Sequence, residues 1–108
     1  MYTYYNKVQS EEHMLYATEI AICFGINSEK NNPHGSFITK YINNYIVTNI
    51  VDYRPVYYIN NRGKANEVYP KSIYLNAMIN LFREMSERDK TYTMSINNKN
   101  YKVKRVEV

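Results

Sequence analysis

The spacing of apolar residues changes from helical to strand-like near residue 90, and this change strongly constrains the fold. Before it, apolar residues recur at i, i+4, i+7 and i+11, which predicts a helix that starts near Pro70. These residues are Tyr74, Met78, Leu81 and Met85. After it, apolar and polar residues alternate, which is typical of a half-buried β-strand. A chain with both patterns is predicted to form an α+β domain.

The alternating segment predicts a C-terminal hairpin over residues 89–108, with its turn at 97–100. Lys102 and Lys104 are expected to point away from its apolar face. The alternation slips at Lys104 and Arg105, which indicates a bulge or the end of the strand. The side chains expected on the apolar face are Tyr92, Met94, Ile96, Tyr101 and Val103.

A helix is also predicted over about residues 11–24. Ser10 is a good N-cap, Glu11 and Glu12 suit the first turn, and Gly25 suits the C-terminal end. The residues expected on its buried face are Met14, Thr18, Ala21, Ile22 and Phe24. Cys23 lies in the same apolar run and is expected to behave as a small hydrophobic residue.

The next helix is expected to be capped by Ser36. Its polar face is expected to carry Lys40, Asn43 and Asn44. Residues 46–51 fit either the tail of this helix or a β-strand. The apolar face of the helix is predicted to contain Phe37, Ile38, Tyr41, Ile42 and Tyr45.

A second hairpin is predicted where residues 54–59 and 65–69 flank residues 60–64, whose Asn and Gly residues tolerate positive φ. We call this hairpin the wing, because it follows a pair of helices. Residues 1–9 are expected to form an added strand or a loose arm. The sequence thus predicts one small domain over residues 1–108, with three helices and the wing in 10–88 and the basic hairpin in 89–108.

The net positive charge comes from the C-terminal end of the chain. Residues 1–87 contain eight basic and eight acidic residues, whereas residues 88–108 contain six basic and two acidic residues, which gives the net charge of +4. A basic patch attracts nucleic acid or an acidic partner. No segment approaches the roughly 20 apolar residues of a membrane span, so we expect a cytoplasmic protein that is not inserted in a membrane.

The chain contains thirteen tyrosines and no tryptophan. Tyrosines can form a surface that stacks on bases or on a protein partner. A compositional bias toward A/T-rich codons explains the abundance of Tyr, Asn, Ile and Lys more simply. We therefore favour the bias over a dedicated stacking surface.

Three phrases occur in a characteristic order: Tyr-Ala-Thr-Glu opens residues 16–25, Phe-Ile-Thr-Lys opens residues 37–44, and Gly-Lys opens residues 63–71, which end in Tyr-Pro-Lys. Together they resemble the KilA-N domain, a DNA-binding module of phage antirepressor-type and large DNA-virus proteins that is related in fold to fungal APSES domains. The resemblance covers residues 16–82. Tyr41 and Tyr69 stand where the family commonly has tryptophan and histidine.

The resemblance implies that Lys40, Asn43 and Asn44 face a DNA groove, where lysine reaches guanine or phosphate and asparagine pairs with adenine. It also implies that Arg62 and Lys64 on the wing contact phosphates or a narrow minor groove. The residues that would extend this footprint are Lys99, Lys102, Lys104 and Arg105. The alternative is that all these side chains form an ordinary solvated surface and that the hairpin lysines protect a sheet edge.

No pattern in the chain indicates catalysis. His13 and His34 lack metal-ligand spacing, and the single cysteine, Cys23, supplies neither a zinc cluster nor an internal disulfide. Its apolar surroundings do not favour a reactive thiolate. The carboxylates form no nuclease motif and the three glycines form no phosphate loop. We therefore expect no enzyme activity, no metal and no cofactor.

Two functions follow from these observations. The first is a non-enzymatic DNA-binding regulator of a phage, virus or mobile element that binds duplex DNA by a helix and the wing. A homodimer would suit this function, because DNA regulators often match palindromic sites. The second is a small viral inhibitor that binds a host nuclease, replication protein or anti-phage defence complex.

Overall fold

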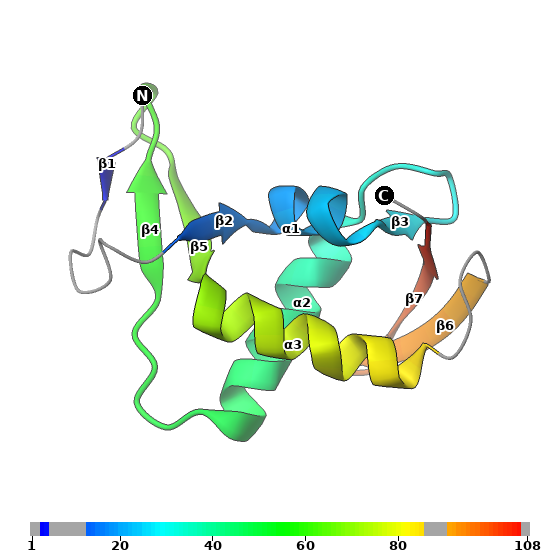
Figure 1. Ribbon diagram of the computed structural model, residues 1–108. Coiled ribbons are helices and arrows are strands. Elements are labelled where there is room, and N and C mark those ends of the chain that lie inside the picture. The colour runs from blue at the N-terminus through cyan, green and yellow to red at the C-terminus, as the bar shows by residue number, and fades with distance from the viewer. Residues whose placement is uncertain (1–2, 5–12, 86–90, 107–108) are drawn as a thin grey trace.

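Three helices occupy the middle of the molecule, and an antiparallel sheet lies at each end (Figure 1). The computed structural model describes residues 3–4, 13–85 and 91–106. The helices are α1 (Ala17–Phe24), α2 (Gly35–Asn49) and α3 (Lys71–Glu84). The strands are β1 (Thr3–Tyr4), β2 (Met14–Tyr16), β3 (Ile26–Ser28), β4 (Val56–Ile59), β5 (Ala65–Pro70), β6 (Thr91–Ile96) and β7 (Lys99–Arg105). The predicted α+β class, with three helices and two hairpins, is confirmed.

The first sheet contains the wing and has the strand order β1-β4-β5-β2. β4 and β5 pair from Val56 opposite Val68 to Ile59 opposite Ala65, and residues 60–64 form the loop, as predicted. β1 pairs with β4, so residues 3–4 form an added strand at the edge of the sheet.

The second sheet contains the C-terminal hairpin and has the order β3-β7-β6. Its turn is shorter than predicted: Asn97 and Asn98 have φ values of 52° and 66°, whereas Lys99 already belongs to β7. Two successive residues with positive φ are typical of a type I′ turn, whose twist matches that of the strands. The predicted apolar face is confirmed by the buried Ile96, Tyr101 and Val103. β7 ends at Arg105, where the alternation of the sequence slips.

The first helix begins later in the structure than the sequence predicts. Met14–Tyr16 form β2, which pairs with β5, and the helix starts only at Ala17. The ladder with β5 commits the backbone of residues 14–16 to an extended conformation, which excludes a helix there. Ser10, Glu11 and Glu12 lie outside the described residues. The predicted end is confirmed, because Gly25 adopts the left-handed conformation with φ 68°.

The buried face of α1 also differs from the prediction. Ile20 and Ala21 are buried and Phe24 is half-buried, whereas Thr18, Ile22 and Cys23 are exposed. Because only eight residues are helical, one side of two turns is enough to contact the core, and the rest of the apolar run faces outward. Cys23 is therefore an exposed thiol and not a core residue.

The second helix starts two residues earlier than the predicted Ser36 cap implies. His34 is the N-cap of α2, Gly35 is its first residue, and Ser36 lies inside the first turn. The helix continues to Asn49, so residues 46–49 are its tail and not a strand. Its buried residues are Phe37, Ile38, Tyr41, Ile42 and Ile46, which confirms most of the predicted face.

One hydrophobic cluster joins the three helices to the C-terminal hairpin. It includes Ile20 of α1, Ile42 of α2, Leu81 of α3 and Val103 of β7, all fully buried. Of the ten tyrosines in residues 13–85 and 91–106, four are buried and six are half-buried, so none in this part of the chain is fully exposed. None of the helices in the described segments is long and apolar enough to cross a membrane.

Candidate nucleic-acid interface

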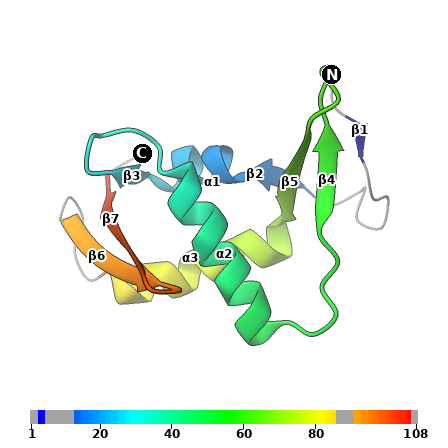
Figure 2. The same ribbon diagram turned by 180° about the vertical axis from the view of Figure 1, so that it is seen from behind.

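The middle of α2 carries the predicted groove-facing residues on the surface of the molecule. Seen from behind, α2 crosses in front of α3 and lies between the wing and the C-terminal hairpin (Figure 2). Lys40 and Asn44 are exposed, whereas Asn43 is half-buried. None of the fifteen residues of α2 is acidic. The structure thus brings a helix without negative charge between two hairpins.

Asn43 is held by a contact with the wing. Its Oδ1 accepts a hydrogen bond of 3.2 Å from the hydroxyl of Tyr69 on β5. Tyr69 is 1% exposed, and burial, together with the neighbouring Glu67 carboxylate, raises the pKa of its hydroxyl far above 10. The Tyr69 hydroxyl therefore stays protonated and connects the wing to α2.

Asn44 is exposed on the flank of α2 that lies next to α3. It lines a small hollow of about 110 Å³ together with Tyr41, Asn80 and Glu84. The Asn80 amide donates a hydrogen bond of 3.0 Å to the Tyr41 hydroxyl. Burial and the Glu84 carboxylate raise the pKa of Tyr41 to about 12. Asn44 is thus accessible and has a carboxylate on its α3 side.

The loop of the wing presents Arg62 and Lys64 to solvent. The Oδ1 of Asn60 accepts hydrogen bonds of 2.9 Å from the backbone N–H groups of both residues. Gly63 has φ 79°, a conformation that side chains disfavour, and lies at the tip between them. The Asn60 side chain therefore holds the loop in a shape that leaves both cationic side chains exposed.

The four basic residues of β7 differ in their surroundings. The Lys102 ammonium lies 3.6 Å from the Glu29 carboxylate, and both side chains are largely exposed. The Lys99 ammonium lies 5.4 Å from the ring centre of Tyr101. The Arg105 guanidinium stacks 3.6 Å over the ring of Phe82.

Arg105 is therefore engaged with the core, since a guanidinium at this distance makes a cation–π contact. Lys104 is half-buried and forms no ion pair with any residue that the structure describes. The exposed pair of Lys102 and Glu29 contributes little to stability and leaves Lys102 free to exchange partners. Lys99, Lys102 and Lys104 are therefore better placed to contact a ligand than Arg105 is.

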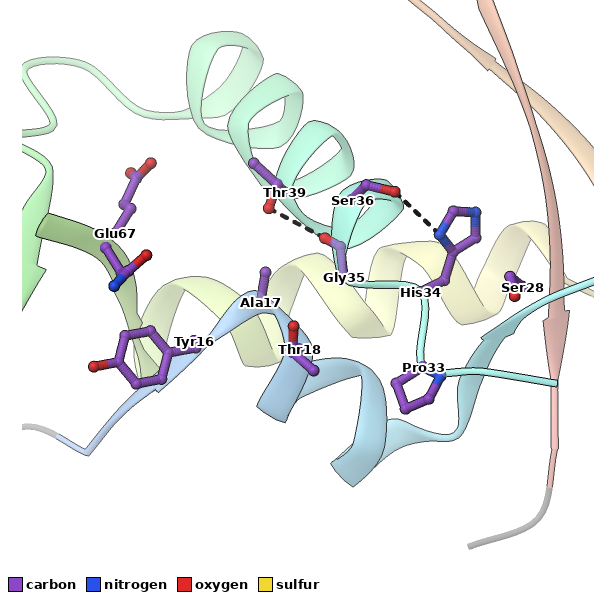
Figure 3. Close-up of a pocket in the computed structure, with 11 residues that line it drawn as sticks. Tyr16, Ala17, Thr18, Ser28, Pro33, His34, Gly35, Ser36, Thr39 and Glu67 are labelled. Atoms are coloured by element: carbon purple, nitrogen blue, oxygen red, sulfur yellow. Dashed lines mark hydrogen bonds between the residues drawn. The ribbon is translucent and has the colours of Figure 1, made fainter. Parts of the chain in front are cut away.

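A cavity of about 520 Å³ lies where the first turns of α1 and α2 meet the wing (Figure 3). Glu67 of β5 stands on one side of it and His34 and Ser36 stand at the start of α2. Burial raises the pKa of Glu67 and lowers the pKa of His34. The Ser36 hydroxyl lies 3.3 Å from Nδ1 of His34. The cavity is lined by hydrogen-bonding groups and one carboxylate.

Three residues that matter for this surface escaped sequence analysis. Asn60 could have been found by its position at the start of an Asn-Asn-Arg-Gly loop, where an asparagine side chain often bonds to the backbone. Val47, which is exposed on α2, could have been found by extending the helical phase of α2 through residue 49. The contact of Tyr69 with Asn43 joins residues 26 positions apart and has no local signal.

Comparisons of the chain with protein-family models, curated proteins and solved structures give no match. The resemblance to the KilA-N domain therefore stays a prediction based on the three phrases. Among the residues that the structure describes, no three His, Cys, Asp or Glu side chains come together as a metal site.

Proposed function

We propose that the chain is a non-enzymatic DNA-binding protein that holds duplex DNA with α2 in the major groove and the wing on the backbone. The observation that carries the proposal is the position of α2, a helix of fifteen residues without an acidic side chain, between two hairpins that present lysine and arginine (Figure 2). DNA is a dense polyanion, so a surface with this distribution of charge attracts it.

The side chains on this surface suit two kinds of contact: phosphate contacts that position the protein on DNA and base contacts that recognise the sequence. Arg62 and Lys64 are flexible cations at a loop tip, which is the chemistry of phosphate contacts. Lys40 and Asn44 lie on a helix whose width fits the major groove. Glu67 disfavours a phosphate at the first turn of α2, so the DNA is expected to contact the later turns of the helix.

The experiment is a salt titration of binding to a mixed pool of duplex DNA, followed by sequencing of the bound fraction. Each phosphate contact contributes about −0.9 to the slope of log K against log salt. Arg62→Ala and Lys64→Ala should each reduce the magnitude of this slope by about 0.9, which changes the affinity loss between 50 and 200 mM salt by about 3.5-fold. Lys40→Ala and Asn44→Ala should weaken sequence preference.

Arg83→Ala is the matched control, because Arg83 is exposed on α3, which lies behind α2 when α2 faces the viewer (Figure 2). It should leave the salt slope unchanged. Absence of binding at 50 mM salt would refute the proposed function. An unchanged slope in both wing variants would refute the proposed role of the wing.

A second candidate, a protein-binding inhibitor, is favoured by apolar residues on the other helices. Ile22 on α1 is 54% exposed, and Leu75 and Ile79, one turn apart on α3, are 37% and 43% exposed. Such residues suit the centre of a protein interface. If the chain does not bind DNA, retention of a host protein that is lost in Leu75→Asp and Ile79→Asp would favour this function.

A further inference from the structure

Val47 is an apolar residue on the polar face of α2. It is 83% exposed, although the other large apolar side chains of the helix contact the core. Valine is also a weaker helix former than alanine, lysine or glutamine, because its branched side chain loses rotamer freedom in a helix. Val47 therefore adds neither core packing nor helix propensity, and its methyl groups are available for contact with a ligand.

Val47 lies in line with the two residues proposed to recognise DNA. Lys40, Asn44 and Val47 are separated by four and three residues, which places them on one face of a helix. The distance along the helix axis from Lys40 to Val47 is about 10 Å at ~1.5 Å per residue. This length corresponds to about three base pairs at ~3.4 Å each.

The chemistry of this stripe matches one kind of base pair. In the major groove, asparagine can bond bidentately to the N6 and N7 of adenine, and an apolar side chain can cover the C5-methyl group of thymine. Asn43 is less suited to this role than Asn44, because its Oδ1 already accepts a hydrogen bond from Tyr69. The stripe contains no arginine, the residue that most often recognises guanine.

Building on the DNA-binding function proposed above, we infer that α2 recognises a short A·T-rich element, with Val47 against a thymine methyl group and Asn44 on an adenine edge. Lys40 contacts a phosphate or a guanine at the end of the element. A duplex with thymine in the major groove uses the exposed valine, the asparagine and the absence of negative charge on α2 together.

The test uses the sequence that the wild-type protein selects from the DNA pool. Each thymine of that sequence is replaced in turn by deoxyuridine, which removes only the C5-methyl group. One replacement should weaken wild-type binding about four-fold, since burial of one such carbon contributes ~0.8 kcal/mol. Val47→Ala should weaken binding to the unmodified DNA by a similar factor and should not respond to that replacement.

Val51→Ala is the matched control, because Val51 is 86% exposed but follows the end of α2. It should retain the wild-type response to deoxyuridine. Asn44→Ala should lose preference for an adenine within three base pairs of that thymine, by about five-fold or more. Circular dichroism should give the wild-type spectrum for each variant, since the three side chains are exposed.

Four results would overturn the inference. Binding without any selected sequence, or a selected sequence in which no thymine responds to deoxyuridine, would refute base recognition by Val47 while DNA binding itself stands. A Val47→Ala protein that keeps the wild-type response would show that another group contacts the methyl. Absence of DNA binding at low salt would refute the proposed function and this inference with it.

Discussion

Replacement of Tyr69 by phenylalanine tests whether the wing is fixed to α2 by a hydrogen bond. The substitution keeps the aromatic ring in a site that is 1% exposed and removes only the hydroxyl that donates to Asn43 over 3.2 Å. Asn43 and Glu67 are only half-buried, so water can replace part of the lost interaction. The expected cost is therefore that of one net hydrogen bond, about 1 kcal/mol.

This cost is measurable by urea unfolding and by thermal unfolding, each monitored by circular dichroism. A loss of ~1 kcal/mol corresponds to a decrease in Tm of about 4–8 °C for a domain of this size. The m-value should not change, because the surface exposed on unfolding is the same. DNA binding should also weaken, since the wing and α2 lose their polar connection.

Tyr74→Phe provides the matched control. Tyr74 is 4% exposed and its hydroxyl lies 3.0 Å from Nδ1 of His13, so its loss should cost a similar amount of stability. The contact with His13 does not involve α2 or the loop of the wing, and DNA binding should remain as in the wild type. Equal stability of Tyr69→Phe and wild type, or equal DNA affinities of the two variants after correction for folded fraction, would refute the reasoning.

Three further predictions follow from the cavity at the start of α2. A Cβ at Gly35 would lie 2.6 Å from Oγ1 of Thr18, so Gly35→Ala should lower the free energy of unfolding, measured by chemical denaturation, by about 1–3 kcal/mol. Adding Thr18→Ala to this variant should restore most of the loss. Burial lowers the pKa of His34, so the unfolded chain binds more protons near pH 6, and stability should fall as the pH drops below about 6.5. In His34→Gln this part of the pH dependence, measured by thermal unfolding, should be reduced. Burial raises the pKa of Glu67, so protonation favours the folded state and Glu67→Gln should be more stable than wild type at pH 7. Equal melting temperatures of these two proteins at pH 7 would contradict this, and the difference should shrink as the pH is lowered through the range where Glu67 protonates.

Several elements were predictable because their signals are local. The helix from 71 to 84 carries its apolar residues at helical spacing, and the hairpin after residue 90 carries them at strand spacing. The wing is marked by an Asn- and Gly-containing loop between two apolar segments. The nine candidate DNA-contacting residues fall on three elements, and the sequence already separated Lys40 and Asn44 from the apolar face of their helix.

The errors occurred where a distant segment decides the local conformation. Met14–Tyr16 fit a helical pattern, but pairing with β5, more than 50 residues away, makes them a strand. The same pairing shortens α1 and leaves Ile22 and Cys23 exposed. Periodicity within a short window contains no information about such partners.

The sequence by itself determined the helix over residues 71–84, the two hairpins and the approximate positions of their loops, because these depend on side-chain spacing and on backbone preferences within a few residues. Only the tertiary structure decided which side chains are available for binding. Asn43 is occupied by Tyr69 and Arg105 by Phe82, whereas Asn44 and Val47 remain exposed. Hydrogen bonds and ring contacts act over a few ångströms in space, and the fold brings these partners together from positions 23 and 26 residues apart in the chain.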